Sequence, residues 1–121
     1  MPYDFPAQRL IAYRLCREVL VDFVAIEGRW PRGWADLRDQ GKRSTTSVLL
    51  NLAEGASQPM DGRAKGRHYA IALASLGESA AVVDAASALK LSDRKELAEL
   101  EEKMKRLGAL IGGLLRRARK R

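Results

Sequence analysis

The chain has few residues of the types that perform covalent chemistry or bind metals. Its 121 residues include one cysteine, Cys16, and one histidine, His68. A single cysteine excludes an intramolecular disulfide. Cys16 lies on an apolar helical pattern far from His68, so we interpret it as a small buried hydrophobic residue rather than a nucleophile. Bundles that bind two metal ions through carboxylates use Glu-x-x-His pairs, and the sequence contains none. It therefore predicts no metal site and no cofactor.

Signals for strands and for membrane insertion are also scarce. β-branched residues never alternate with polar ones over a useful length, which argues against a sheet. No apolar run reaches the roughly 18 residues that span a bilayer. The first residues lack the basic segment and the apolar segment of a secretory signal. We therefore expect a cytoplasmic protein without a membrane partner.

Helical periodicity is what the chain does contain. Its length, with 46% hydrophobic and 31% charged residues, is typical of one folded domain over residues 1–121. Apolar residues recur at three- and four-residue steps, which predicts helices over about 6–27, 34–57, 64–89 and 93–119. Ser92 suits the N-cap of the last helix, and the clearest break is at 57–62. This pattern favours an all-α, antiparallel up-down four-helix bundle.

The second predicted helix carries a row of polar residues among apolar ones. Arg43, Ser47, Asn51 and Glu54 follow one another at steps of four, four and three. Glu78 lies on the predicted apolar stripe of the third helix, where an unpaired carboxylate would be costly. We interpret these five residues as an internal polar network. An enzyme that uses Glu54 and Glu78 is the alternative, but the chain lacks a nucleophile–histidine arrangement and a phosphate-binding glycine loop.

Small residues form rows on two of the predicted helices. Each glycine inside a helix costs roughly 1 kcal/mol relative to alanine, so the close approach of another helix is the expected compensation. The rows either pack helices of one chain together or form a subunit interface, and the sequence leaves both open. The residues concerned are Ala70, Ala74, Gly77, Ala81, Gly108 and Gly112.

The net charge is +7, and positive residues crowd the end of the chain. Such a charge favours a polyanionic partner, above all nucleic acid, although a basic tail can also serve solubility alone. We expect the junction of the second and third helices and the end of the fourth to lie at opposite ends of the bundle. One chain would then carry separate basic spots rather than one groove. The candidate nucleic-acid-binding residues are Lys42, Arg63, Lys65, Arg67, Lys105, Arg106, Arg116, Arg117, Arg119, Lys120 and Arg121.

Three segments resemble those of a known family. Residues 43–55 are similar to the signature R-x-x-x-S-[IV]-x-x-N-[IL]-A-E-G of the small four-helix-bundle proteins encoded in 23S rRNA intervening sequences. Residues 69–78 resemble that family's second segment, in which an aromatic residue precedes A-x-x-S-L-x-E, and residues 107–116 look like its usual ending. The chain departs from the pattern at Leu49, where many relatives have proline, and at Gly41, where leucine is usual. Residues 57–59 also replace the more usual Gly-Arg.

The resemblance carries further expectations. The same superfamily includes the accessory variability determinant (Avd) of diversity-generating retroelements, which forms a pentameric barrel and binds a reverse transcriptase and its template RNA. The resemblance to this superfamily implies that the chain forms a homopentamer, that its outer surface is basic and binds RNA rather than DNA, and that it has no catalytic residues. The leading hypothesis is a non-enzymatic, oligomeric, nucleic-acid-binding protein, in its most specific form an RNA-binding accessory to a retroelement reverse transcriptase. The alternative is a protein–protein scaffold whose basic tail docks an acidic partner.

Overall fold

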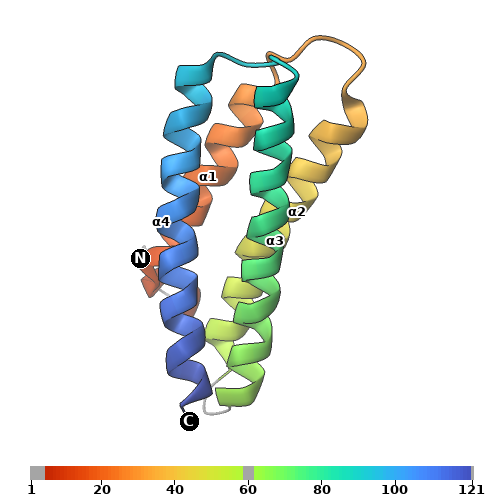
Figure 1. The fold of residues 1–121 in the computed structure, drawn as a ribbon. Helices are drawn as coiled ribbons and strands as arrows, with labels where there is room; N and C mark the ends of the chain where they lie inside the picture. Colours follow the sequence, from red (N-terminus) through yellow and green to blue (C-terminus); the bar gives the residue numbers. More distant parts are fainter. Residues whose placement is uncertain (1–4, 59–61, 121) are drawn as a thin grey trace.

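The chain folds into four long helices preceded by one short helix (Figure 1). The computed structural model describes residues 5–58 and 62–120, and this part contains no strand. Successive long helices run antiparallel, which confirms the predicted all-α architecture of four antiparallel helices. The elements are η1 (Pro6–Arg9), α1 (Ile11–Glu27), α2 (Ala35–Ser57), α3 (Gly62–Ala88) and α4 (Arg94–Arg119).

The first helix is divided where the sequence predicts one continuous element. Pro6 begins η1, a single 3₁₀ turn, and Leu10 then has extended backbone angles of φ −78° and ψ 127°. Proline is favoured in a first helical turn because the missing N–H has no partner there. The predicted helix over 6–27 is therefore wrong at its start, since α1 begins only at Ile11.

Each long helix packs against two others and does not contact the third, which lies diagonally across the bundle. α2 contacts α1 and α3, and α4 also contacts α1 and α3, with no direct packing between α1 and α3. The described core residues form one hydrophobic cluster that takes side chains from all four helices. Because α1 and α3 are diagonal, their outward faces lie on opposite sides of the bundle.

The heptad pattern of α4 places its core residues as the sequence predicts. Leu97, Leu100, Met104, Leu107 and Ile111 are all buried. The same three- and four-residue spacing predicts Leu114 as the next core residue, but Leu114 is half-buried and Leu115 is buried instead. The start of α4 differs too, because the Asp93 side chain caps the helix by accepting from Lys95 N at 3.2 Å. The predicted cap, Ser92, instead accepts a hydrogen bond from Trp30 Nε1 and so ties the two loops at this end together.

The structure bears out only part of the predicted apolar stripe of the third helix, in which Val82 is buried and Ser75 and Ala85 are half-buried. Ile71 is 43% exposed, and Glu78 and Leu89 are exposed as well. The buried side of α3 is one position away, on residues such as Tyr69 and Leu76. α3 is apolar on nearly every side, so its periodicity selects no single face. Among the described helices, α3 alone is long and apolar enough to cross a membrane. Buried helices of soluble proteins meet the same criterion.

The direction of the helices brings two basic segments to one end. α1 and α3 run one way and α2 and α4 the other, so the end of α2, the start of α3 and the end of α4 meet at the lower end of the bundle (Figure 1). The expectation that the α2–α3 junction and the end of α4 lie apart is therefore wrong. The start of α2 lies at the other end, with the end of α1 and the start of α4 (Figure 1). The predicted break at 57–62 falls partly outside the described residues.

Two glycines of α2 allow its closest helix contacts. A Cβ atom at Gly41 would lie 2.1 Å from the ring of Phe23 in α1, and one at Gly55 would lie 2.5 Å from the ring of Tyr69 in α3. Neither position accepts a side chain without moving a buried aromatic ring. Glycine at residue 41, where the resembling family has leucine, thus makes room for Phe23.

Candidate nucleic-acid interface

Positive charge is dense at the lower end of the bundle. Arg116, Arg117, Arg119 and Lys120 are exposed, and none forms an ion pair with residues 5–58 or 62–120. The C-terminal dipole of a helix offsets only about half a unit charge, so most of this positive charge is left to act on an external anion. We call these four residues, with Arg63 and Arg67 at the start of α3, the basic end.

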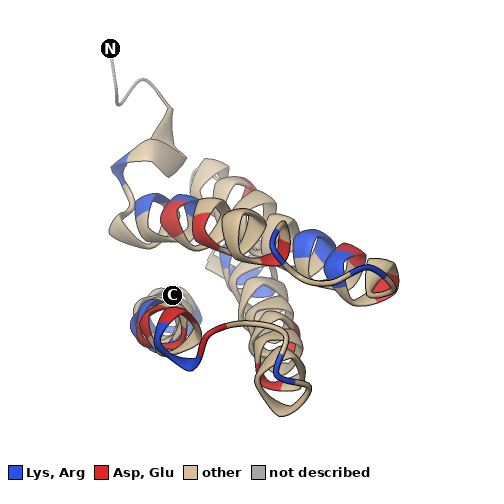
Figure 2. Cartoon of the chain, turned by 90° about the horizontal axis from the view of Figure 1, so that it is seen from above, with Lys and Arg blue, Asp and Glu red and all other residues tan. Residues whose placement is uncertain are grey.

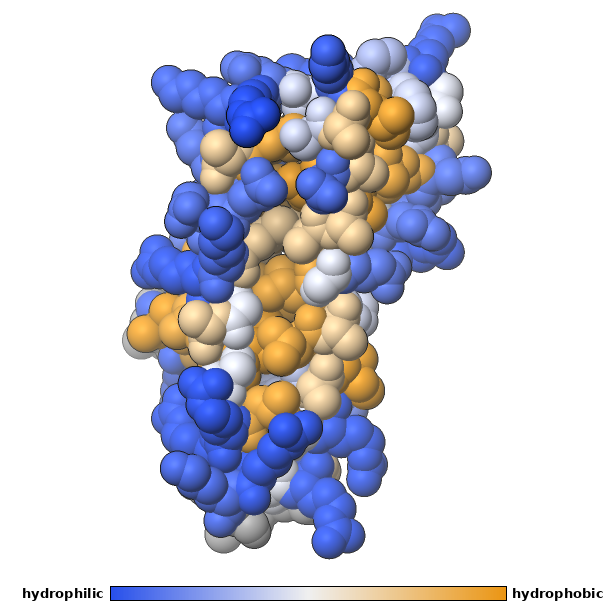
Figure 3. All heavy atoms as spheres, viewed as in Figure 1, coloured by the Kyte–Doolittle hydropathy of each residue, from blue (hydrophilic) through white to orange (hydrophobic). Residues whose placement is uncertain are grey.

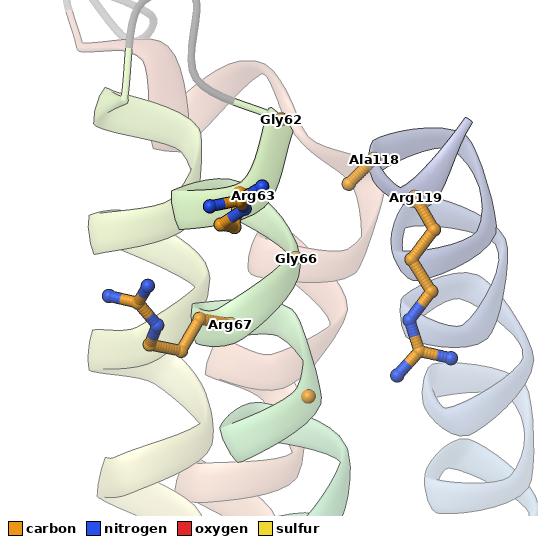
Figure 4. Close-up of a pocket in the computed structure, with 7 residues that line it drawn as sticks. Gly62, Arg63, Gly66, Arg67, Ala118 and Arg119 are labelled. Atoms are coloured by element: carbon orange, nitrogen blue, oxygen red, sulfur yellow. The ribbon is translucent and has the colours of Figure 1, made fainter. Parts of the chain in front are cut away.

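A pocket opens between the start of α3 and the end of α4. Its volume is about 450 Å³. Figure 4 shows that Gly62, Gly66 and Ala118 leave its floor free of long side chains, while arginines from both helices stand at its rim. In this conformation Arg67 points toward α2 and away from Arg119. We call this the arginine pocket, lined by Gly62, Arg63, Gly66, Arg67, Ala70, Ala118 and Arg119.

Tyr69 lies beneath the basic end. Burial raises the pKa of its phenol, and the charge of Arg117 opposes that shift to a smaller extent. Tyr69 is 4% exposed, so its ring is part of the core rather than a surface for stacking a base. The aromatic residue of the second signature segment therefore contributes to helix packing.

Several of the predicted binding cations have partners within the chain. Lys42 lies 3.7 Å from the buried carboxylate of Glu27, and Lys105 lies 3.7 Å from Glu102 on its own helix. Lys65 donates to the carbonyl oxygens at the end of α2, at 3.0 and 3.3 Å, and so satisfies groups that a helix end leaves open. Arg106 is exposed on α4. The predicted residue Arg121 lies outside the described residues.

The other parts of the bundle mix charges of both signs. Lys103 of α4 bridges two acids of α1, at 2.6 Å to Asp22 and 3.3 Å to Glu18. The hydrogen bond to Asp22 is the main cause of a raised pKa at Lys103. Arg29 and Glu96 form a further pair at 2.6 Å. Figure 2, which looks down on the end opposite the C-terminus, shows Lys and Arg interspersed with Asp and Glu.

A polar cluster forms on α2 and α3 from three of the five predicted residues, Ser47, Asn51 and Glu54, together with Ser75 and His68 of α3. Ser47 bonds Ser75 across the two helices at 2.8 Å, and Asn51 bonds both Ser47, at 3.2 Å, and His68, at 3.1 Å. His68 lies 3.4 Å from Glu54, whose side chain is 64% exposed. The cluster is thus half-buried, with Glu54 at its exposed edge, and it joins the two signature segments.

Arg43 and Glu78 do not belong to this cluster, so their place in an internal network is wrong. Both are exposed, and neither makes a hydrogen bond or ion pair within the described part of the chain. Glu78 turns to solvent because α3 buries the neighbouring face. Arg43 instead helps to line a shallow hollow on α2, together with Glu54 and Asn51. Glu78 is not among the described residues of that hollow, so the two carboxylates do not share it.

The polar groups that are buried were not predicted as a network. Ser79 of α3 bonds Ser44 at 2.7 Å and Thr45 at 2.9 Å, both in α2. The Thr45 carbonyl oxygen also lies 3.9 Å from Cys16 Sγ in α1. Burial raises the pKa of the Cys16 thiol to about 12, so the thiol is neutral at ordinary pH. Small hydroxyl residues inside an apolar stripe are the sequence signal for this arrangement.

A buried ion pair also holds the α1–α2 loop. Glu27 is 6% exposed and lies 3.0 Å from Arg38 Nε. Arg38 also donates to the carbonyl oxygens of Trp30 and Pro31, at 2.6 and 3.0 Å. These bonds are structural, because the Arg38 guanidinium donates its hydrogen bonds to the loop and not to a ligand. Among the described residues, no group of three or more His, Cys, Asp or Glu side chains is placed to hold a metal ion.

An apolar groove runs between α3 and α4 on the face shown in Figure 3. A hollow of about 280 Å³ within it is lined by Leu73, Leu76, Gly77 and Met104, among others. A Cβ atom at Gly77 would meet nothing within 4 Å, and one at Gly108 would make only an ordinary contact with Leu76 at 3.5 Å. Ala74, Gly77 and Ala81 are exposed. These small residues therefore do not bring helices of the single chain close together.

The remaining small residues behave in the same way. A Cβ atom at Gly112 would approach only Arg116 of its own helix, at 3.4 Å, and Ala70 lines the arginine pocket. The sequence leaves open whether the rows of small residues pack helices of one chain together or form a subunit interface. The structure does not support close packing within one chain at these small residues. Tight packing within the chain occurs instead at Gly41 and Gly55.

Comparison with known proteins gives one result. The model of the 23S rRNA-intervening sequence protein family matches residues 8–113. No curated protein matches the chain.

Proposed function

We propose that this chain, which belongs to the 23S rRNA-intervening sequence protein family, is an oligomeric protein that binds nucleic acid through its basic end. One observation carries the proposal. Four cations of the basic end, unpaired within the described chain, lie within five residues at the end of α4, and no Asp or Glu follows Glu102 in the sequence. By contrast, Lys103 and Arg29 are paired, and the cations at the other end lie among Asp and Glu (Figure 2). An unpaired cation gains most from a phosphate, because no internal ion pair has to be broken first.

Salt dependence tests this proposal. In the variant Arg116→Glu/Arg117→Glu/Arg119→Glu, RNA should bind more weakly. For a single strand, each phosphate contact contributes about 0.7 to the slope of log affinity against log salt. Losing three contacts should flatten that slope by about 2. Fluorescence anisotropy of a labelled RNA over a range of salt concentrations measures both quantities.

A matched control separates the place of the charge from its amount. Arg32, Arg94 and Lys95 are exposed at the other end of the bundle and form no ion pair within the described residues. Reversing these three to glutamate changes the net charge by the same amount and should leave most of the slope in place. An equal loss in both triple variants would show that net charge alone attracts the RNA, and the basic end would then have no special role.

The oligomer is supported by two unpartnered faces on opposite sides of the bundle. α3 exposes its row of small residues, and α1 exposes Val21 and Val24, at 67% and 43%. α1 and α3 do not contact each other within the chain. A contact between α1 of one copy and α3 of the next is heterologous, and such contacts form closed rings when the rotation closes. We propose a ring, with five copies as the family resemblance implies.

Sedimentation of matched alanine variants tests the ring. Ala74→Gln and Ala81→Gln place a polar side chain where a second helix would have to approach, yet both sites are exposed in the single chain. We expect smaller species with unchanged helicity. Ala109→Gln, at an exposed site on α4, should leave the assembly intact. A wild-type protein that stays monomeric at micromolar concentration would reject the ring.

A protein–protein scaffold is the second candidate, and the apolar groove between α3 and α4 favours it. In that case the basic end would dock an acidic protein surface. A binding assay that compares structured RNA with an acidic protein separates the two candidates. RNA as the nucleic acid and a reverse transcriptase as the protein partner come from the family resemblance and stay proposals, as does the absence of enzymatic activity.

A further inference from the structure

We infer that the arginine pocket binds the terminal phosphate of an RNA chain. The inference rests on the proposed function and deepens it, since it names the chemical group that enters one particular site. The pocket is the place where α3 and α4 both contribute cations, Arg63 and Arg67 from one helix and Arg119 from the other.

The charge of the lining distinguishes this pocket from others on the molecule. No described residue that lines it is acidic. Four other hollows on the surface each combine cations with at least one carboxylate, from Glu54 on α2 to Glu101 on α4. A carboxylate repels an incoming phosphate and occupies the cations that would hold it. Among the described residues, the lining of the arginine pocket thus differs from that of these four hollows, because Arg67 and Arg119 have no carboxylate beside them there.

The floor of the pocket explains how a phosphate can reach the helices. Gly62, Gly66 and Ala118 carry no side chain beyond a methyl group, so the space between α3 and α4 stays open (Figure 4). A volume of about 450 Å³ lies within the range of about 300–1,000 Å³ typical of small-ligand sites. The pocket thus has room for a phosphate and part of its nucleoside, which a flat basic surface does not provide.

The number of arginines fits a terminal phosphate better than one inside the chain. A phosphomonoester carries between one and two negative charges near neutral pH and offers three acceptor oxygens, as phosphorylated side chains do. An internal phosphodiester carries one charge and two free oxygens. Each guanidinium can donate two parallel hydrogen bonds. Arg67 and Arg119 are exposed, and exposed side chains change rotamer within picoseconds to nanoseconds, so both can turn onto a bound phosphate.

A pair of short RNAs with the same sequence tests the inference. One carries a 5′-phosphate and the other a 5′-hydroxyl, and anisotropy or calorimetry measures their affinities for the full chain. We expect the phosphorylated RNA to bind at least about tenfold more tightly, which corresponds to roughly one net hydrogen bond to a charged group. Equal affinities would overturn the inference and leave the proposed function standing.

Matched variants locate the effect. Arg67→Gln/Arg119→Gln should remove the preference for the 5′-phosphate. Arg106→Gln/Arg116→Gln removes the same charge from exposed sites outside the pocket, so it should weaken both RNAs alike and keep their ratio. A preference that survives Arg67→Gln/Arg119→Gln would place the phosphate elsewhere and refute the pocket.

A third variant fills the pocket without changing its charge. A Cβ atom at Gly66 would make only ordinary contacts, 3.8 Å from Ala118 and 3.9 Å from Leu115, so Gly66→Gln can enter the helix, and circular dichroism checks its folding. This variant should lose the preference while it keeps its affinity for the hydroxylated RNA.

A mononucleotide distinguishes failure of the pocket from failure of the proposed function. If the wild-type chain binds neither RNA, the proposed function fails, and adenosine 5′-monophosphate then probes the pocket directly. Binding that Arg67→Gln/Arg119→Gln abolishes would show a phosphomonoester site that serves free nucleotides rather than RNA ends. No binding of this nucleotide would refute the pocket as well.

Discussion

Replacing Gly55 by alanine tests how closely α2 and α3 approach each other. The new Cβ atom would lie 2.5 Å from Tyr69 Cε1 and 2.9 Å from its Cδ1, whereas nonbonded carbon atoms pack at about 3.5–4.0 Å. Tyr69 is held on all sides by the core, so relief requires the two helices to separate. Overpacking of this kind costs about 1–3 kcal/mol.

Gly108→Ala is the matched control for this substitution. Its Cβ atom would lie 3.5 Å from Leu76 Cδ2, an ordinary contact. Both substitutions gain about 1 kcal/mol of helix propensity, and this gain cancels when the two variants are compared. We expect Gly108→Ala to stabilise the protein and Gly55→Ala to be about 1–3 kcal/mol less stable than Gly108→Ala. At about 4 °C per kcal/mol for a chain of this size, their melting temperatures should differ by about 4–12 °C.

Urea denaturation followed by far-UV circular dichroism measures the difference. The measurement is repeated at several protein concentrations, because self-association adds to apparent stability. In a Tyr69→Leu background the ring is gone, so Gly55→Ala should become as favourable as Gly108→Ala, and the double-mutant cycle gives the coupling energy. Equal stabilities of Gly55→Ala and Gly108→Ala in the wild-type background would refute the close approach of the helices.

Three further predictions concern buried polar groups. Below pH 9 the Cys16 thiol is neutral in both states, but above it the unfolded thiol ionises while the folded thiol, with its pKa raised to about 12, does not. Unfolding free energy should therefore fall by about 1.4 kcal/mol per pH unit above pH 9, and Cys16→Ala should remove that contribution in alkaline urea titrations. Glu27→Gln should lower the free energy of unfolding by roughly 1–3 kcal/mol, which is less than the loss from breaking a fully buried ion pair, because Arg38 still reaches water. An unchanged free energy of unfolding would show that the ion pair does not stabilise the fold. Ser79→Ala leaves the Thr45 hydroxyl without its partner and should cost about 1–3 kcal/mol in thermal unfolding, whereas Ser87→Ala, at a half-buried site, should be nearly neutral.

Amphipathic helices were predictable because burial leaves a period in the sequence. α4 alternates apolar steps of three and four, and its buried residues from Leu97 to Ile111 follow that pattern. α3 gives no such guide. Its alanines and glycines have little preference for either the core or the surface, so the choice of buried face depended on which neighbours met Tyr69 and Leu76.

The polar residues show the same division. Ser47, Asn51 and Glu54 do lie close together, as their spacing on one helix requires, and Ser75 and His68 of α3 complete the cluster. The spacing along one helix says nothing about the partners across the bundle. Glu78 was therefore assigned to the network by a stripe that α3 buries only in part, and Ser79, the next residue, bonds in the core instead.

The position of the basic end depends on the direction in which each helix runs. In an up-down bundle every second helix runs in the same direction, so the α2–α3 junction and the end of α4 lie at the same end. The position of the basic end therefore follows from the sequence once a bundle is inferred. The arginine pocket was not, because its floor depends on the lateral spacing of α3 and α4 around Gly66 and Ala118.

By itself, the amino-acid sequence determined the helical class, the family and the excess of positive charge, because each is a property of composition, local periodicity or motif. Tertiary structure decided which charges remain available. Packing paired Lys42 with Glu27 and Lys103 with Asp22, and it placed Arg119 at the end of α4 across a pocket from the arginines at the start of α3. Coulomb interactions depend on distances in space, and residues far apart in a sequence acquire those distances only when the helices pack.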